Sequence, residues 1–281
     1  MRRVNFIGLG AQKAGTSWIA ACLAEHPEIC IPLKELHFFS RERHWKQGVE
    51  WYETRFERCG DVPCSGEFCT SYLYSDEAPS RIHETYPDVK LIACLRDPVD
   101  RAFSNYVNDI MAGRVSRETP FREALQSHPE YTEQGQYAQQ LQRYFERFPR
   151  QNILVLIYED CRQNPGEFLR SMFEFLQVDP TFVPPSLHQR VNPARIPRSM
   201  PFDHALNWAS DKMRRAGMTG LVTAIKRTRI PDRVRALNSR RVSSDRLRIS
   251  PRDRASLKDL FACDVLELEH LLGRELHPWS G

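Results

Sequence analysis

The sequence predicts an α/β protein in which a parallel sheet is flanked by helices. Short apolar runs alternate with helical patterns through the first two thirds of the 281 residues, and this alternation is typical of parallel strands joined by helices. Two apolar runs, 4–9 and 90–95, are each followed by a polar turn with a basic residue and then by a helical pattern. Ligands of open α/β sheets bind at such turns, outside the carboxyl ends of the strands.

The expected elements follow one another in the order of such a fold. Strands are expected at 4–9, 29–31, around Glu67, at 90–95 and at 153–158. Helices are expected at 16–25, 45–58, 77–86, from 98 onward, and at 120–126, 137–148 and 165–176. Asp97 and Pro98 have the residue types of a helix cap and a first helical turn.

A proline-rich segment at 179–201 separates the sheet region from a basic C-terminal part. We expect a single domain over 1–281, with an α/β core at 1–189 and a loop and helical cap at 190–281. The core has a net charge of −5 and the cap one of +9. Such a cap is either a solvated surface or a region that attracts an anionic ligand. It has no aromatic-interleaved motif, so we expect no nucleic-acid partner.

The composition excludes several classes of protein. With 41% hydrophobic and 27% charged residues, 13 Gly and 19 Pro, the chain is no collagen, coiled coil or grossly disordered segment. Its apolar runs have the length of strands, so we expect no transmembrane segment. The first residues lack a signal-peptide cleavage site, and we expect a cytoplasmic location with free thiols. Cys59, Cys64 and Cys69 lack the close pairs of zinc ribbons, so we expect no metal site.

The turn after the first strand has the features of a phosphate-binding loop. Gly10 and Gly15 have the spacing of a nucleotide-binding loop, but the lysine stands at position 13 and two hydroxyl residues follow the second glycine. Backbone N–H groups and the helix N-terminus would face an anion here, without a clear magnesium ligand. The candidate residues are Gln12, Lys13, Ala14, Gly15, Thr16 and Ser17. The alternative is an ordinary glycine-rich connector.

A second candidate anion site follows the strand at 90–95. Arg96 ends that strand and could grip a phosphate with two hydrogen bonds, in one crevice with Lys13. Ser104, nearly two turns into the next helix, could add a hydroxyl. For Arg101 we expect instead a surface pair with Asp97 or Asp100.

The segment Lys34-Glu35-Leu36-His37-Phe38-Phe39 offers a candidate base. If this segment is extended, Glu35 and His37 share one side and could take a proton from a hydroxyl. The alternative is a salt bridge between Glu35 and Lys34. Glu67, on a short strand before Tyr72, is a second candidate carboxylate.

These three segments together resemble the sulfotransferases that use 3′-phosphoadenosine 5′-phosphosulfate, especially the heparan-sulfate type and its bacterial relatives. The resemblance implies that 12–17 bind the 5′-phosphosulfate, that Arg96 and Ser104 bind the 3′-phosphate, and that Glu35 is the general base beside His37. Arg195 and Arg198 would lie on a basic loop that closes over the cofactor, and 268–279 would be the terminal helix. Phe68 stands where relatives often have a lysine on the substrate side, a departure that argues against a heparan-like acceptor.

The resulting functional prediction is in-line sulfuryl transfer to an acceptor hydroxyl, without a metal, leaving adenosine 3′,5′-bisphosphate. Lys13 would stabilise the leaving phosphate oxygen, Glu35 would remove the proton, and Glu67 and Tyr72 would lie on the acceptor side. The acceptor could be a glycan, a glycolipid or a small secondary metabolite, and the oligomeric state is left open. The resemblance implies a bacterial cytosolic member. The alternatives are a magnesium-dependent phosphotransferase and a non-catalytic nucleotide-dependent binding module.

Overall fold

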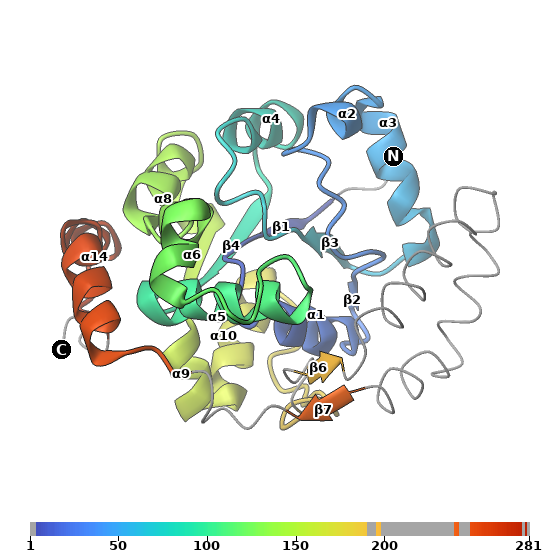
Figure 1. Ribbon diagram of the computed structural model, residues 1–281. Helices are drawn as coiled ribbons and strands as arrows, with labels where there is room; N and C mark the ends of the chain where they lie inside the picture. Colours follow the sequence, from blue (N-terminus) through green and yellow to red (C-terminus); the bar gives the residue numbers. More distant parts are fainter. Residues whose placement is uncertain (1–3, 190–194, 198–238, 242–247, 277–278, 280–281) are drawn as a thin grey trace. The chain divides into compact units, whose positions relative to one another are not determined.

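The computed structural model describes residues 4–189, 195–197, 239–241, 248–276 and 279. The chain divides into two compact units, one of 1–105, 125–192 and 251–281 and one of 106–124 and 193–250. Residues 251–281 fall in the unit that contains the sheet, and the expected single domain with a boundary at residue 190 stays a prediction. Figure 1 shows the elements along the chain.

The sheet unit contains five parallel strands, as predicted. Their order is β2-β3-β1-β4-β5, and every neighbouring pair is parallel. The strands are β1 (Phe6–Gly10), β2 (Ile29–Cys30), β3 (Cys64–Phe68), β4 (Lys90–Leu95) and β5 (Ile153–Ile157). Strands β1 and β3 are buried along their whole length, as is typical of parallel strands covered on both faces. In the other unit, β6 (Arg195–Pro197) pairs antiparallel with β7 (Ser239–Arg241).

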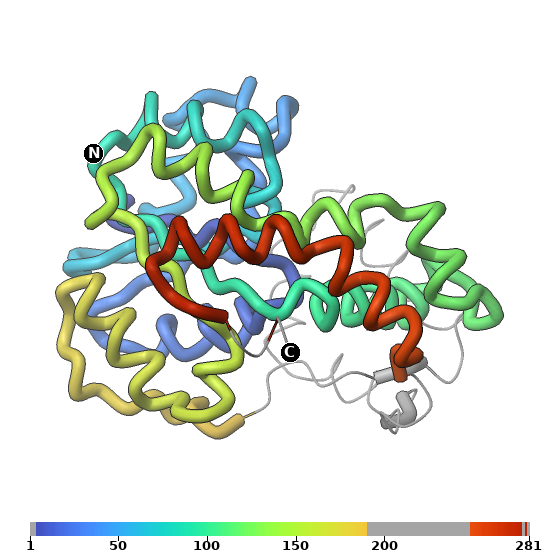
Figure 2. Tube along the Cα trace, turned by 90° about the vertical axis from the view of Figure 1, so that its left-hand side faces the viewer, coloured from blue at the N-terminus to red at the C-terminus, as the bar shows by residue number. Residues whose placement is uncertain are grey.

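Helices cover both faces of this sheet. Figures 1 and 2 show α1 and α10 on one face and α4 and α8 on the other. The helices are α1 (Thr16–Ala24), α2 (Glu42–Trp45), α3 (Gly48–Glu53), α4 (Ala78–Thr85), α5 (Pro98–Met111), α6 (Phe121–Ser127), α7 (Glu130–Glu133), α8 (Tyr137–Phe145), α9 (Tyr158–Gln163), α10 (Pro165–Leu176) and α14 (Pro251–Leu272), with 3-10 helices η1 (Thr54–Cys59) and η2 (Arg150–Asn152). Among the described residues, none of these helices is both long and apolar enough to span a bilayer.

The two largest departures from the expected helix bounds are at 45–58 and at the terminal helix. The expected helix at 45–58 is divided into α2, α3 and η1. Gly48, the first residue of α3, adopts a left-handed backbone with φ 83°, which separates α3 from α2. The terminal helix does not begin at 268. It begins at Pro251 and ends at Leu272, where Gly273 takes φ 62°, the usual conformation just beyond a helix C-terminus.

The long helix α14 is fixed to the sheet unit by polar contacts at and just beyond its C-terminal half. The carboxylate of Asp264 accepts hydrogen bonds from the backbone N–H groups of Tyr137 (2.7 Å) and Ala138 (3.1 Å), at the start of α8. Burial raises the pKa of Asp264 to about 6. Beyond the helix, Arg274 makes two hydrogen bonds to the Asp160 carboxylate, of 2.7 and 2.8 Å.

The expectation of free thiols throughout the chain is wrong at two positions. Cys30, at the end of β2, forms a disulfide with Cys59, at the end of η1. The three evenly spaced cysteines therefore share no structural role, because Cys59 is in the disulfide and Cys64 and Cys69 are free and buried. Of the free cysteines, only Cys263 is exposed. The disulfide removes one argument for a reducing compartment, and the cytoplasmic location stays a prediction.

Candidate active site

The turn from β1 to α1 leaves backbone donors available for an anion. Lys13 and Gly15 both adopt left-handed conformations, with φ 71° and 79°. The backbone N–H groups of Gly15, Thr16 and Ser17 have no acceptor within the part of the chain that the structure describes, because the first amides of a helix precede its hydrogen-bond ladder. A helix N-terminus with such donors and a neighbouring lysine fits a phosphate group.

Two contacts support the conformation of this loop, one with an aromatic ring and one with a thiol. The Tyr158 ring, at the start of α9, packs so closely on Gly15 that a Cβ atom there would lie 2.8 Å from it. The carbonyl of Ala14 accepts a hydrogen bond of 3.1 Å from the thiol of Cys94. The loop therefore requires a glycine at position 15 for both its backbone angle and its packing.

Arg96 lies beside this loop, as the topology predicted. Its guanidinium donates a 3.1 Å hydrogen bond to the carbonyl of Lys13 and lies over the Tyr158 ring, 5.3 Å from the centroid. A weaker ion pair joins it to Asp100 at 3.9 Å. A guanidinium has five N–H donors, so Arg96 has further donors to offer an anion at the same edge of the sheet.

The helix after Arg96 begins as the sequence predicted. The Asp97 carboxylate accepts hydrogen bonds from the N–H groups of Val99 (2.8 Å) and Asp100 (3.1 Å), which makes Asp97 the N-cap of α5. Ser104 is half-buried on this helix.

The expected surface pair of Arg101 is wrong. Its side chain is fully buried and donates to the side chain of Gln134 and to the carbonyl of Tyr131. Both partners lie some thirty residues further along the chain, so local sequence gave no sign of them. Arg254 of α14 takes the place of Arg101 beside Asp100, at 2.6 Å. Arg195 lies in β6, where only the backbone is described, and Arg198 lies outside the described residues.

The segment that carries Glu35 and His37 is not extended, which corrects the premise of the sequence prediction. Both residues adopt left-handed conformations, with φ 64° and 54°. Their side chains nevertheless lie on the same side, and the buried Leu36 and Phe38 point into the core. Two residues with left-handed backbones, 35 and 37, thus place alternate side chains on opposite sides, as an extended strand would have done.

The Glu35 carboxylate is held by Thr70, the second residue after the end of β3. It accepts hydrogen bonds from the backbone N–H of Thr70 (3.0 Å) and from the Thr70 hydroxyl (3.2 Å). Lys34 lies 3.7 Å from the same carboxylate, so the expected ion pair is present. Lys34 also donates a 2.7 Å hydrogen bond to the Ser17 hydroxyl in the first turn of α1. One lysine therefore joins the phosphate-type loop to the carboxylate.

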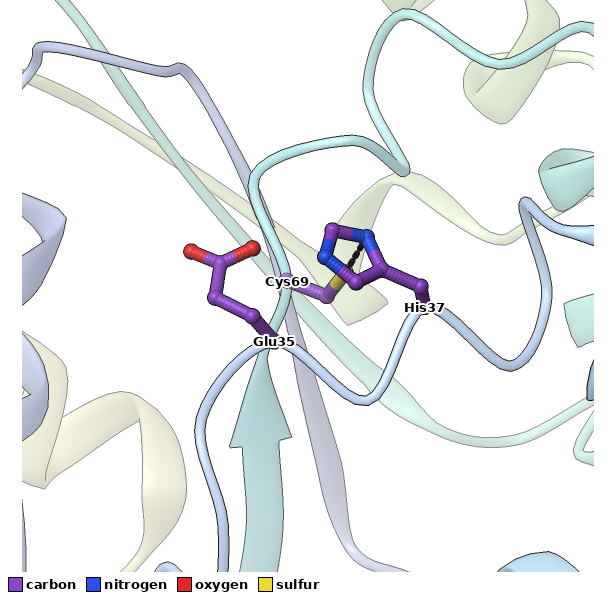
Figure 3. Close-up of side chains that lie close together, drawn as sticks. All are labelled: Glu35, His37 and Cys69. Carbon is purple, nitrogen blue, oxygen red and sulfur yellow. Dashed lines mark hydrogen bonds between the residues drawn. The ribbon is translucent and has the colours of Figure 1, made fainter. Parts of the chain in front are cut away.

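His37 lies in a small polar cluster with Cys69 and Ser71. Its Nδ1 atom is 2.8 Å from the Ser71 hydroxyl and 3.3 Å from the Cys69 sulfur. Figure 3 shows Glu35, His37 and Cys69 close together, with the dashed contact between His37 and Cys69. Burial lowers the pKa of His37, with a further contribution from the charge of Arg41. Sequence reasoning missed Cys69, Thr70 and Ser71, although all three follow a strand end at the ligand-binding edge.

Glu67 and Tyr72 lie inside the core. Neither side chain is exposed, and the Tyr72 hydroxyl donates a 2.7 Å hydrogen bond to the Glu67 carboxylate. The same carboxylate accepts the N–H of Leu36 at 3.2 Å, and the Tyr72 hydroxyl accepts the N–H of Phe38 at 3.0 Å. Burial raises the pKa of Glu67 to about 7. The pair thus binds the backbone on either side of His37.

A polar groove of about 670 Å³ begins at this cluster. Its walls come from the segment after β3 and from the region of α7 and α8. They are lined by Ser40, Arg41, Ser71, Tyr74, Ser75, Asp76, Glu77, Glu133, Gln136, Gln139, Gln140 and Arg143. The groove therefore carries many neutral hydrogen-bonding groups with a few charges of both signs.

The fold and the β1–α1 loop define a P-loop-like α/β protein. A family model described as a sulfotransferase domain matches residues 5–218. The chain belongs to this sulfotransferase family, as the motifs predicted.

The relatives include enzymes of heparan sulfate modification. The human heparan sulfate glucosamine 3-O-sulfotransferase 6 is 32% identical over 174 residues, 60% of this chain and 50% of that protein. The human bifunctional heparan sulfate N-deacetylase/N-sulfotransferase 3 is 28% identical over 206 residues, 64% of this chain and 23% of that protein. This chain spans about half the length of the first relative.

A solved structure supports the fold over the whole chain. The sulfotransferase from Alicyclobacillus acidocaldarius has a TM-score of 0.73 and 27% sequence identity, and the comparison covers 100% of both chains. The parallel sheet with helices on both faces is therefore the fold of a known sulfotransferase.

Proposed function

We propose that this chain transfers a sulfuryl group from 3′-phosphoadenosine 5′-phosphosulfate to an acceptor hydroxyl, with Glu35 as general base. The observation that carries the proposal is the pair of contacts made by Lys34. Its ammonium group bonds to Ser17 in the phosphate-type loop and lies 3.7 Å from the Glu35 carboxylate. An anion site and a candidate base are thus neighbours, as in-line transfer between two oxygens requires.

The loop residues would hold the 5′ end of the donor. The amides of Gly15, Thr16 and Ser17 would donate to its oxygens, and Lys13 would add a positive charge. When bound, the donor supplies the sulfuryl group and the phosphate that leaves with the adenosine. Charge gathers on that phosphate oxygen in the transition state, so donors fixed in advance at this position lower the barrier.

Arg96 and Ser104 would bind the 3′-phosphate. The guanidinium of Arg96 is already oriented by the Lys13 carbonyl and the Tyr158 ring, so little side-chain freedom is lost when it binds an anion. We also assign to this end of the donor the basic residues Arg195 and Arg198, whose side chains the structure does not describe.

Glu35 would take the proton of the acceptor hydroxyl while that oxygen bonds to sulfur. Two donors from Thr70 orient the carboxylate, and a positioned base of this kind contributes about 100- to 10,000-fold to a reaction. His37 would contact the same hydroxyl. For Glu67 and Tyr72 we propose positioning roles in place of direct acceptor contact, because both are buried and hold the backbone beside Glu35 and His37.

The acceptor would lie in the polar groove, and we propose that it is a carbohydrate. The groove begins at Ser71, beside His37, and carries three glutamines, a tyrosine and serines along its walls. Neutral donors and acceptors of this kind suit a ligand with many hydroxyl groups. Transfer of labelled sulfate to a panel of oligosaccharides and of small phenols tests this point, and labelling of the phenols alone would refute it.

Two substitutions test the roles of base and loop. Glu35→Gln keeps the size of the side chain but cannot take up a proton, and Lys13→Ala removes the loop charge. Each is expected to lower turnover roughly 100-fold or more. Glu50→Gln and Lys46→Ala, both on the exposed surface, are the matched controls and should leave turnover unchanged. Normal single-turnover rates in Glu35→Gln would move the role of base to another residue.

Nucleotide-dependent thermal stability separates this function from the two alternatives. Adenosine 3′,5′-bisphosphate without magnesium should raise the unfolding temperature, because a ligand that binds only the folded state stabilises it. Stabilisation by ATP with magnesium alone would indicate a phosphotransferase. Nucleotide binding without any transfer, and unchanged by Glu35→Gln, would indicate a binding module.

A further inference from the structure

We propose that Glu35, His37 and Cys69 form a binding site for a zinc ion that inhibits the enzyme. Their ligand atoms all lie within 4.8 Å of one another, and Figure 3 shows the three side chains converging from two separate segments. Binding of the ion does not depend on the proposed function, whereas inhibition rests on it. The ion would not be a cofactor of the proposed transfer, because two of its ligands, Glu35 and His37, are the residues proposed to act on the acceptor hydroxyl.

The donor set points to zinc. A carboxylate, an imidazole and a thiol are the three groups that zinc takes as ligands, and magnesium and calcium use oxygen alone. Zinc bonds of about 2.3 Å to sulfur and 2.0–2.1 Å to nitrogen at a tetrahedral angle separate the two atoms by about 3.5 Å. The observed distance between the Cys69 sulfur and the His37 Nδ1 atom is 3.3 Å. These two ligands already have the spacing that zinc requires.

Backbone contacts hold the two ligand-bearing segments together. The N–H of Glu35 donates to the carbonyl of Phe68 at 2.9 Å. On the other side of His37, the N–H of Phe38 donates to the buried Tyr72 hydroxyl at 3.0 Å. The backbone of both ligand-bearing segments is thus held in place before a metal arrives, which lowers the entropic cost of binding it.

The third ligand needs only a small movement. The Glu35 side chain is 29% exposed, and a carboxylate has two oxygens with about four acceptor positions. One oxygen can keep its bond to Thr70 while the other turns to the ion. Lys34 lies 3.7 Å from Glu35 and Arg41 lies near His37, and both charges oppose a cation. When the ion replaces the Lys34 ammonium group beside the carboxylate, Lys34 keeps its hydrogen bond to Ser17.

Binding has a defined proton balance and a defined effect. The Cys69 thiol loses its proton to the solvent when the zinc–sulfur bond forms, because the thiolate is the ligand. His37 binds through its unprotonated Nδ1 atom and gives up its contact with Ser71. A zinc-bound Glu35 carboxylate can no longer take a proton from an acceptor hydroxyl. Occupation of the site therefore stops transfer, and a chelator restores it.

The first experiment measures binding without reference to activity. Cobalt(II) is added to the purified full-length chain, and the charge-transfer absorption of a cobalt–thiolate bond is followed. We expect one equivalent to bind, zinc to displace it, and Cys69→Ser to weaken the affinity about 100-fold or more, since loss of even an outer-shell partner costs 10- to 100-fold. Cys263→Ser removes the exposed thiol and should leave the absorption unchanged. Absence of the band, or its loss in Cys263→Ser, would overturn the site.

The second experiment measures inhibition. Zinc should inhibit sulfuryl transfer by the wild-type chain and by Cys263→Ser, and inhibition should require at least about 10-fold more zinc in Cys69→Ser and Cys69→Ala. Unfolding temperatures of both Cys69 variants show whether each is folded. Cobalt binding at Cys69 without zinc inhibition would overturn the inhibitory role. Absence of transfer in the metal-free wild type would contradict the proposed function, and the cobalt result would still decide the site.

Discussion

The two loops that would meet at the sulfuryl group are built in different ways. The loop before α1 offers backbone amides, and its shape depends on Gly15 and the ring behind it. The loop around Glu35 and His37 offers side chains, and its shape depends on the buried pair Glu67 and Tyr72. An anion can be held by main-chain groups, but proton transfer needs a titratable side chain. The difference separates substitutions that act on donor binding from those that act on turnover.

The largest effect is expected for Gly15→Ala. The new Cβ atom would lie 2.8 Å from the Tyr158 ring, in a backbone with φ 79°. The left-handed conformation and the crowding together should lower the free energy of unfolding by roughly 2–5 kcal/mol and abolish stabilisation by adenosine 3′,5′-bisphosphate. Denaturant unfolding with and without nucleotide measures both.

Gly273→Ala is the matched control for this change. Gly273 has φ 62° but nothing within 4 Å of a Cβ atom, so it carries the conformational cost of about 1–2 kcal/mol alone and should leave nucleotide binding intact. Equal losses of nucleotide binding in the two variants would show that the Gly15 loop has no special part in it.

The next effect is expected for Glu67→Gln, which tests the other loop. The amide cannot accept the hydrogen bonds of both Leu36 and Tyr72 as the carboxylate does. The segment of Glu35 should loosen, and turnover should fall about 10- to 100-fold with unchanged affinity for adenosine 3′,5′-bisphosphate. Steady-state kinetics and calorimetry separate the two quantities.

Glu53→Gln controls for the replacement of a tyrosine-bonded carboxylate by an amide outside the site. Glu53 accepts a 3.0 Å hydrogen bond from the Tyr86 hydroxyl outside the site, and turnover should not change. A loss of nucleotide affinity in Glu67→Gln would mean that the two loops are not separable.

A smaller effect is expected for Arg96→Ala. Removal of the guanidinium should weaken binding of adenosine 3′,5′-bisphosphate about 10-fold, on the scale of one charged hydrogen bond, and change the single-turnover rate less. Calorimetry measures the affinity. Arg254→Ala removes another arginine that contacts Asp100 and serves as the control. Unchanged affinity in Arg96→Ala would remove Arg96 from the donor site.

The smallest effect concerns Asp264 of α14, which belongs to neither loop. Its pKa in the folded protein is raised to about 6, so the folded state keeps a proton that the unfolded chain, with a pKa of about 3.9, has released. Stability from this group is present at low pH and is lost as pH rises through about 6. Asp264→Asn should therefore reduce the fall in unfolding free energy between about pH 4 and 6, and denaturant titrations measure it. Asp259→Asn, exposed on the same helix, should keep the wild-type slope, and an equal slope in Asp264→Asn would refute the assignment.

Local patterns in the sequence were enough for the sheet and for the loop before α1. Strands β1 and β5 are continuous apolar runs and β4 is one after Lys90, and Asp97 caps α5 through contacts within three residues. The end of α14 and the break at Gly48 were missed. Both depend on a glycine with a positive φ angle, and the spacing of hydrophobic residues does not predict the sign of φ.

Sequence predicted the residues of the site that lie within one short segment, and missed those that come from distant parts of the chain. Glu35 and His37 were found from their spacing, although the left-handed backbone that places them was not. Their contacts with Thr70 and Cys69 join positions more than thirty residues apart. Arg101 was misassigned for the same reason, since its buried partners come from the region around α7. Contacts of this length depend on the packed fold.

The Cys30–Cys59 bond has a consequence for the chain that carries the base. The bond spans a sequence separation of 29 and encloses both Glu35 and His37. A protease that cuts at the exposed Arg43 or Lys46 would open the peptide chain without releasing a fragment. Such a nicked protein would keep its full mass until a reductant is added, and its two pieces would stay tethered across the cut.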